Sequence, residues 1–253
     1  MKITIITVVF NAADTILDAL DSVSKQSHRD VEHIVVDGAS TDRTLDIIKR
    51  HGSRVAKIIS EPDKGIYDAM NKGLRLATGE VIGFLNADDV YEKSDVLECV
   101  ANNMHRNELD ALFGDVVYVN PSNTHRVIRR YSSKNFRPSR IAWGWMPSHP
   151  ALFFRSSIYK QYGLFREDYK IAGDYEYVAR VFKPGNDIKY MYYPGVLVRM
   201  RTGGASAASW KNTILLNREV VRACRENGLS TNIAKVMSKY PSKLLELLLK
   251  NSK

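Results

Sequence analysis

The sequence has few cysteines and no long hydrophobic segment. Only two of its 253 residues are cysteine, Cys99 and Cys224, and both lie in segments with a helix-like pattern. Two such cysteines suggest neither a disulfide framework nor a zinc site. No stretch approaches the ~18 apolar residues that a membrane-spanning helix requires. Residues 3–10 are apolar, but Asn11 and Asp14 follow at once, so a buried strand explains them better than a signal peptide. We therefore expect a cytoplasmic protein.

Glycine-rich phosphate-binding loops are also missing after the first apolar segment. A dinucleotide oxidoreductase carries G-x-G-x-x-G there, whereas this chain has Asn11, Ala12, Ala13 and Asp14 after Phe10. A sugar nucleotidyltransferase usually has a glycine-rich, basic loop at the same place. A dinucleotide oxidoreductase is therefore disfavoured, and a sugar nucleotidyltransferase is kept as an alternative.

Composition indicates a large core and a basic surface. Hydrophobic residues make up 44% of the chain and charged residues 26%, which is enough to bury a substantial core. The 37 basic and 28 acidic residues give a formal charge of +9. That charge suits phosphate-bearing ligands, an anionic membrane surface or nucleic acid, and does not choose among them.

Strand-like and helix-like segments alternate in the first half of the chain. Apolar runs predict strands at residues 3–10, 32–36, 56–59 and 81–85, and amphipathic patterns predict helices at 12–23, 44–51 and 67–77. Strict alternation implies right-handed crossovers and a mostly parallel sheet. The sequence therefore predicts an α/β fold.

The alternation of predicted strands and helices ends after residue 89. We expect a helix at 96–104, a hairpin of strands at 111–119 and 124–131, a loop at 133–147, a helix at 174–182, a strand-rich segment at 187–198, and helices at 210–227 and 233–250, the last interrupted near Pro241. The final two helices predict a helical C-terminal extension.

Acidic residues stand where two predicted strands end. Asp88 and Asp89 follow the fourth strand, and adjacent carboxylates repel unless a cation, hydrogen-bond donors or water compensates. Ligands collect at the carboxyl edge of such sheets, where a divalent cation would satisfy both acids. Asp37 ends the second strand and is placed to accept hydrogen bonds from a nucleobase or ribose. The alternative is a set of acidic turns whose charges lie in water.

Four motifs at the ends of predicted elements resemble one enzyme family. They are IVVDGASTDRT at 34–44, EPDKGIYDAMNKG at 61–73, Asn-Ala-Asp-Asp at 86–89 and AGDYE at 172–176, with RTGGAS following at 201–206. Together they resemble the family 2 glycosyltransferases, inverting enzymes that use nucleotide sugars. The resemblance implies the Rossmann-like GT-A fold, a mostly parallel sheet flanked by helices. It divides the chain into a catalytic domain, 1–205, and a C-terminal helical extension, 206–253. Within the domain, 1–95 would bind the nucleotide sugar and 96–205 the acceptor.

The resemblance also implies roles for residues of the donor site. Asp37 would contact uracil or another base, and Asp88 the ribose side of the nucleotide. Asp89 would hold a divalent metal, Mn²⁺ or Mg²⁺, that bridges the diphosphate. Asn71 and Lys72 belong to the segment that often lines the nucleotide pocket in this family.

For the acceptor side, the resemblance places Asp174 as the general base that takes the acceptor hydroxyl's proton. An N-cap of the following helix is the alternative. His149 and Trp145 are placed to meet the acceptor sugar, or else to pack a subdomain. Many family members carry a late histidine near the metal or diphosphate, but this chain has Arg199 and Arg201 there. We expect Arg199 or Arg201 to contact the diphosphate.

These expectations make the protein an inverting glycosyltransferase. It would move a sugar from a nucleotide diphosphate, most commonly UDP in this family, to a hydroxyl of a glycan or polyprenyl-diphosphate-linked saccharide. The setting would be the synthesis of cell-surface polysaccharide or lipopolysaccharide, with no nucleic acid involved. A non-catalytic glycan- or nucleotide-binding module is the alternative from another functional class.

The C-terminal residues 231–253 are basic and amphipathic, with five lysines and one acid, Glu246. Such a segment can lie on the anionic, cytoplasmic face of the inner membrane. It can equally pack on the catalytic domain or on another subunit.

Overall fold

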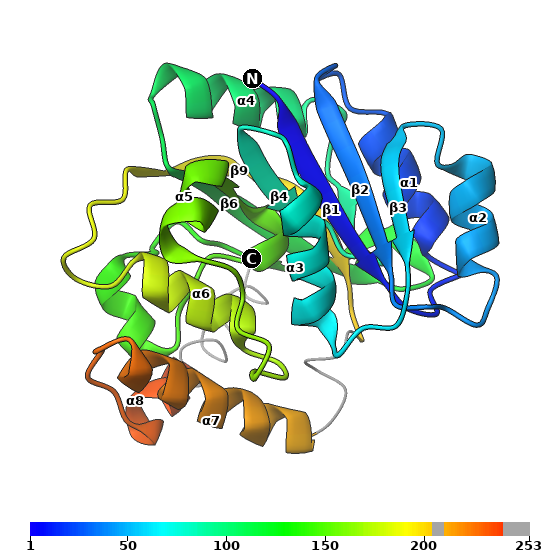
Figure 1. Ribbon diagram of the computed structural model, residues 1–253. Coiled ribbons are helices and arrows are strands. Elements are labelled where there is room, and N and C mark those ends of the chain that lie inside the picture. Colours follow the sequence, from blue (N-terminus) through cyan, green and yellow to red (C-terminus); the bar gives the residue numbers. More distant parts are fainter. Residues whose placement is uncertain (204–209, 240–253) are drawn as a thin grey trace.

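A nine-stranded sheet forms the centre of the computed structural model, which describes residues 1–203 and 210–239 (Figure 1). The strand order is β3-β2-β1-β4-β8-β6-β9-β5. Strand β7 lies off this path and pairs with the C-terminal half of β6. The strands are β1 (Ile3–Val9), β2 (Val31–Asp37), β3 (Val55–Ser60), β4 (Val81–Phe84), β5 (Val90–Tyr91), β6 (Ala111–Asn120), β7 (Asn123–Tyr131), β8 (Leu152–Arg155) and β9 (Tyr190–Arg201).

The first half has the predicted alternation, with parallel pairing of β1 to β2, β1 to β4 and β2 to β3. Helices α1 (Ile16–Ser24), α2 (Thr44–His51) and α3 (Ile66–Leu76) connect these strands. Successive residues of β1 face opposite sides of the sheet: Ile3 and Ile5 pack toward α1, and Ile6 and Val8 toward α3. Burial on both faces explains why this strand has only two polar residues, Thr4 and Thr7, and no charged one.

The second half of the sheet is mixed. Strand β8 pairs antiparallel with β4 and β6, β5 pairs antiparallel with β9, and β6 pairs parallel with β9. The parallel arrangement expected from the sequence therefore holds among β1 to β4, whereas in the second half only the β6–β9 pair is parallel. Strands β5 and β8 and helix α5 (Ser156–Tyr162) were not predicted. They are short, and the sheet rather than the local pattern decides their conformation.

The remaining helices complete the two outer layers. Helix α4 (Val96–Arg106) shares its core with α1, whereas α5 and α6 (Gly173–Val181) share theirs with α3 on the other face (Figure 1). The predicted loop at 133–147 contains a 3-10 helix, η1 (Pro138–Trp143), and η2 (His149–Ala151) follows it.

The C-terminal helices pack on the preceding part of the chain. Helix α7 (Trp210–Glu226) buries Val220, Ala223 and Cys224, and α8 (Ile233–Met237) buries Val236, in the same core as α6. The described part of the predicted extension is thus part of the main core, and residues 240–253 of the basic tail lie outside the described residues. In the part of the chain that the structure describes, no helix has both the length and the apolar character needed to cross a membrane.

A buried carboxylate joins the first four strands. Glu32 on β2 accepts hydrogen bonds from Thr4 Oγ1 at 2.7 Å, Thr78 N at 2.8 Å and Lys57 Nζ at 3.3 Å. These donors come from β1, β3 and the turn before β4. Burial alone would raise the pKa of Glu32, but the hydrogen bonds outweigh burial and lower this pKa to about 2.

We expect Glu32→Gln to lower the free energy of unfolding by about 3 kcal/mol at pH 7, because the folded state prefers the charged carboxylate. A lowered pKa stabilises the fold above the ordinary value of 4.5. The difference between wild type and variant should therefore shrink as the pH falls from 5 toward 2. Urea unfolding at several pH values measures it. Glu108→Gln, at an 86% exposed side chain, is the matched control; equal losses in both variants would contradict the prediction.

Candidate active site

A cleft of about 940 Å³ opens at the carboxyl ends of β1 and β4. Its lining includes residues after β1, the start of α3, the turn after β4, the segment around η2 and the end of β9. Ligands of open α/β sheets bind at this edge, and the volume lies in the range of small-molecule sites. Segments far apart in the sequence therefore meet in one place.

The tandem acids lie in this cleft. Asp89 is 1% exposed and accepts a hydrogen bond from Asn86 Nδ2 at 2.9 Å, while Asp88 is half-buried. Burial and the neighbouring charge of Asp88 raise the pKa of Asp89 well above its ordinary value, and burial also raises the pKa of Asp88. The two negative charges are therefore poorly compensated by the protein itself.

Arg201 is a cationic side chain that interacts with this pair of acids. It ends β9 and lines the cleft. Its Nη1 donates to the backbone oxygen of Asp88 at 2.7 Å, and Nη2 pairs with the carboxylate of Asp18 on α1. The guanidinium lowers the pKa of Asp88 and Asp89, but less than burial raises it. Arg201 thus holds the turn that carries the acids. Residues 204–206 of the RTGGAS motif lie outside the described residues.

The acids fit a divalent cation that binds together with a substrate. Among the described residues, no group of three or more His, Cys, Asp or Glu side chains could hold a metal ion alone. Mg²⁺ and Mn²⁺ sites at phosphates commonly use one or two carboxylates and take their other ligands from phosphate and water. The buried Asp89 and the half-buried Asp88 match that donor set, because a bound cation would favour the charged forms of these two acids, whose pKa values are raised.

Asp174 faces the same cleft from the first turn of α6. Its Oδ1 accepts a hydrogen bond from the backbone N–H of Tyr175 at 2.8 Å, and Tyr67 OH lies 3.4 Å from the same atom. The N-cap of α6 is Ala172, with no side-chain capping bond. The helix-capping alternative for Asp174 is therefore not what the structure shows.

Close packing behind Asp174 depends on Gly173. A Cβ at this position would lie 2.7 Å from Cε2 of Tyr67, whose hydroxyl donates to Ile171 O at 2.7 Å. Tyr67 is 5% exposed and has little room to move. The ring, the hydroxyl bond and the missing side chain together set the position of the start of α6.

Glu219 of α7 holds the segment that precedes Asp174. Its carboxylate is 6% exposed and accepts hydrogen bonds from the backbone N–H groups of Lys170 at 2.9 Å, Ile171 at 2.9 Å and Ala172 at 2.8 Å. Three consecutive amides around one carboxylate form a strong, charge-assisted set. No local sequence signal predicts this contact, because the acid lies 47 to 49 positions after the amides.

His149 also lines the cleft. Its ring packs against Phe84 and Phe165, with centroids 5.1 Å and 5.8 Å away, and its enclosed Nε2 has no hydrogen-bond partner among the described residues. Burial lowers the pKa of His149, while the charge of Asp174 opposes that shift. Burial therefore favours the neutral form of the imidazole, and its unpaired Nε2 is enclosed in the wall of the cleft.

Four residues expected at the site have other surroundings. Asp37 is 0% exposed and accepts hydrogen bonds from Ser40 Oγ at 2.5 Å and Ser60 Oγ at 2.6 Å. Trp145 is half-buried, and neither residue is among the described ones that line the cleft. Their contacts with base and acceptor stay predictions that this geometry does not favour.

Asn71 and Lys72 likewise serve the scaffold. Asn71 is 1% exposed, and it exchanges hydrogen bonds with the backbone of Phe165, both at 2.9 Å. Lys72 Nζ donates to Pro62 O at 2.8 Å and pairs with Glu61 at 2.9 Å. Both side chains brace the segments on either side of α3, and their donor-binding role stays a prediction.

The cleft also contains residues that the sequence did not single out. Phe10 after β1 is 61% exposed, and Asp63 after β3 is half-buried. Tyr118 of β6 joins them from the second half of the sheet. A large aromatic side chain directly after a buried strand was the available signal for Phe10, whereas Asp63 had none beyond its place in the EPDKG motif.

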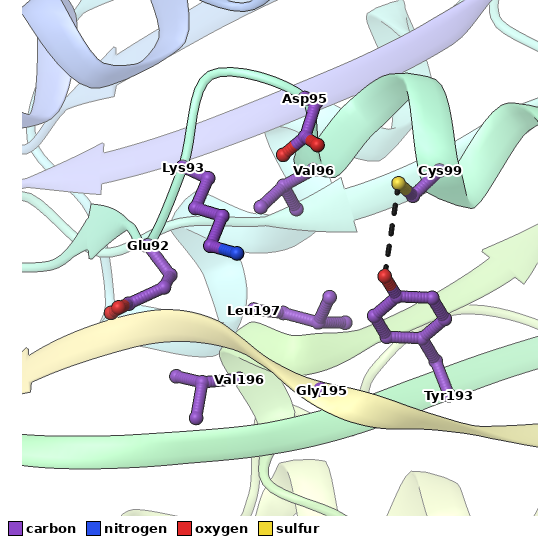
Figure 2. Close-up of a pocket in the computed structure, with 9 residues that line it drawn as sticks. All are labelled: Glu92, Lys93, Asp95, Val96, Cys99, Tyr193, Gly195, Val196 and Leu197. Carbon is purple, nitrogen blue, oxygen red and sulfur yellow. Dashed lines mark hydrogen bonds between the residues drawn. The ribbon is translucent and has the colours of Figure 1, made fainter.

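A smaller pocket of about 270 Å³ lies between β9 and the start of α4. Figure 2 shows Lys93, Cys99 and Tyr193 in its lining, with the Tyr193 hydroxyl donating to Cys99 Sγ at 3.8 Å. None of the predicted site residues lines it. The larger cleft is therefore the candidate active site.

Known proteins with similar sequences identify the family. The family model for glycosyl transferase family 2 matches residues 4–174. This chain belongs to that family. A PGL/p-HBAD biosynthesis glycosyltransferase from Mycobacterium bovis is 32% identical over 199 residues, covering 74% of this chain and 73% of the relative. Membership makes the protein a glycosyltransferase (EC 2.4), and it disfavours the alternatives of a nucleotidyltransferase and a non-catalytic module.

Solved structures confirm the expected GT-A fold of this family 2 glycosyltransferase. S. aureus TarS 1–349 in complex with UDP-GlcNAc has a TM-score of 0.69 at 20% identity, covering 88% of this chain and 66% of TarS 1–349. The mannosyltransferase PcManGT from Pyrobaculum calidifontis, in complex with GDP-Man and Mn²⁺, has a TM-score of 0.62 at 21% identity, covering 87% and 64%. The chain spans 39% of a longer TarS chain. At these identities the likeness concerns the fold.

Gly173→Ala should lower the free energy of unfolding by about 1–3 kcal/mol, because the added methyl group overlaps the buried Tyr67 ring. It should also slow transfer by displacing Asp174. Urea unfolding and an activity assay measure the two effects. In the double variant Gly173→Ala/Tyr67→Leu the loss should be smaller than the sum of the two single losses, since the smaller side chain makes room for the methyl group. A single variant as stable as wild type would show that the contact has no consequence.

Proposed function

We propose that the protein is an inverting glycosyltransferase that moves a sugar from a UDP-sugar to a hydroxyl of a glycan or lipid-linked saccharide. One observation carries the proposal: the tandem acids Asp88 and Asp89 and the single acid Asp174 line the same cleft from different elements. One carboxylate site beside a diphosphate and a second beside the acceptor are what a single displacement requires.

On the donor side, Asp89 would hold Mn²⁺ or Mg²⁺, which supplies positive charge to the diphosphate when bound, and Asp88 would lie on the ribose side of the nucleotide. Arg201 fixes the backbone of Asp88, and so it orients the acids and adds its own charge near the leaving group. Support for a nucleotide-sugar donor comes from the TarS complex with UDP-GlcNAc and the PcManGT complex with GDP-Man and Mn²⁺.

On the acceptor side, Asp174 would take the proton of the attacking hydroxyl as its oxygen bonds to the anomeric carbon. The bond from that carbon to the diphosphate oxygen breaks in the same step, and the nucleoside diphosphate leaves with the electron pair. Attack from the face opposite the leaving group inverts the anomeric centre. His149 lines the same cleft and would lie beside the acceptor.

The setting we propose is cytoplasmic synthesis of a cell-surface polysaccharide or lipopolysaccharide. The M. bovis relative is named for PGL/p-HBAD biosynthesis, and a lipid-linked acceptor fits a basic protein that works at an anionic membrane face. We keep the division into donor half 1–95, acceptor half 96–205 and extension 206–253, with the remaining tail as the candidate membrane contact.

A panel of nucleotide sugars tests the donor. We expect the protein to release nucleotide diphosphate from a UDP-sugar, and EDTA to slow release at least about tenfold, because without the cation the negative acids repel the diphosphate. Coupled nucleotide detection with added Mn²⁺ or Mg²⁺ measures this reaction. Absence of release from every sugar nucleotide, by folded protein supplied with acceptor lipids or glycans, would contradict the proposal.

Two variants separate the roles of the acids. Asp174→Asn should lower kcat by about 10²–10⁴-fold and leave UDP affinity unchanged, because the base acts only in the chemical step. Asp89→Ala should weaken UDP binding in Mn²⁺ but not in EDTA. Titration calorimetry and initial rates measure these effects, with Asp46→Asn on the outer face of α2 as the control. Nearly full rate in Asp174→Asn would remove the base assignment.

A further inference from the structure

The carboxylate of Asp63 occupies the space that a side chain at Gly38 would fill. Gly38 directly follows β2, and a Cβ added to it would lie 2.4 Å from Oδ2 of Asp63 and 3.4 Å from Cδ2 of Phe10. Gly38 is not among the glycines with positive φ, so its backbone conformation does not require glycine. The absence of a side chain at residue 38 instead makes room for the Asp63 carboxylate.

The Asp63 carboxylate is held at one oxygen and free at the other. Oδ1 accepts a hydrogen bond from the backbone N–H of Gly65 at 2.8 Å, the local turn typical of aspartate. Within the part of the chain that the structure describes, Oδ2 forms no hydrogen bond or ion pair. The side chain is half-buried and lines the cleft. It therefore presents an oriented acceptor to a ligand.

The strand order places this acceptor beside the nucleoside. The order is β3-β2-β1-β4, so Asp63, after β3, lies on the far side of β1 from Asp88 and Asp89. The exposed ring of Phe10 follows β1, between the two groups of acids. With the diphosphate at the tandem acids, as the proposed function on which this step rests requires, a base stacked on Phe10 turns its edge toward Asp63. Asp37, turned toward Ser40 and Ser60, is already occupied.

We propose that Asp63, and not Asp37, reads the nucleobase by accepting its ring N–H. Uracil and thymine present N3–H at this edge, and guanine presents N1–H. Cytosine and adenine carry an unprotonated ring nitrogen at the equivalent position, which a carboxylate repels. Sites built to hydrogen-bond one ligand group reject analogues that leave the protein group unpaired. Asp63 is thus a specificity-determining residue for the donor.

The affinities of five free nucleotides test this proposal. Calorimetry with Mn²⁺ and UDP, dTDP, GDP, CDP or ADP should show that the tightest of the first three binds wild type at least about tenfold more tightly than CDP and ADP. In Asp63→Asn, the amide can donate to cytosine N3, so the preference over CDP should fall about tenfold or more. Asp46→Asn removes the same charge outside the cleft and should keep the wild-type preference.

A relocated carboxylate provides a second test. In Gly38→Asp/Asp63→Ser, the new side chain at position 38 occupies the space vacated at position 63, and the serine hydroxyl can accept the Gly65 N–H. We expect the double variant to regain at least part of the preference over CDP that Asp63→Ser alone loses. Gly38→Asp alone should bind every nucleotide more weakly, because two carboxylates crowd one space.

The outcomes separate this inference from the proposed function. If folded wild-type protein binds none of the five nucleotides, the nucleotide-sugar function fails and the inference fails with it. If wild type binds UDP but Asp63→Asn keeps the wild-type preference over CDP, only the inference is overturned. Tighter binding of CDP or ADP than of the other three by wild type overturns it too. Melting temperatures of the variants establish that each is folded.

Discussion

The active site depends on one carboxylate from outside the motif-bearing part of the chain. Glu219 on α7 accepts hydrogen bonds from three consecutive backbone N–H groups, those of residues 170–172, and Asp174 follows two positions later in the first turn of α6. On the other side, Tyr67 of α3 holds the same segment through the oxygen of Ile171. The position of the proposed base is thus set jointly by a helix of the first half and a helix of the C-terminal extension. Because α7 shares its core with α6, the extension is a structural part of the active site.

The cleft concentrates features that disfavour folding. Asp88 and Asp89 are buried side by side with raised pKa values, and the enclosed Nε2 of His149 lacks a partner among the described residues. Unsatisfied or repelling groups of this kind each destabilise a fold by an amount on the order of 1–3 kcal/mol. They persist where a ligand completes them. Elsewhere, buried acids such as Glu32 and Glu219 are surrounded by donors. The contrast marks the cleft as the place where substrate groups supply what the protein leaves out.

Local pattern predicted much of the architecture. Strands β1 and β4 are buried on both faces and therefore appear in the sequence as apolar runs without alternation, and helices α1 to α3 each show an apolar face. Asp88 and Asp89 were expected at the cleft because strand ends position side chains at a sheet edge, and Asp174 because the AGDYE motif resembles one of this family. Strands β5 and β8 escaped prediction because two to four residues carry no period of their own. Asn71 and Lys72 were placed in the right segment, but on a helix each residue faces a different direction, and theirs is toward neighbouring loops.

Sequence alone determined the class of the fold and the family, and it nominated the acids proposed for the chemistry, because alternating hydrophobicity and acids at element ends are local properties of the chain. Tertiary structure decided which acids share a cleft, since that depends on strand order and on contacts such as that of Glu219 with residues about 50 positions away. It also separated two acids that each follow a strand of the sheet. Asp37 turns inward to serine hydroxyls, whereas Asp63 fills the space over Gly38 and faces the cleft. Side-chain direction and competing donors, which no linear pattern records, make that difference.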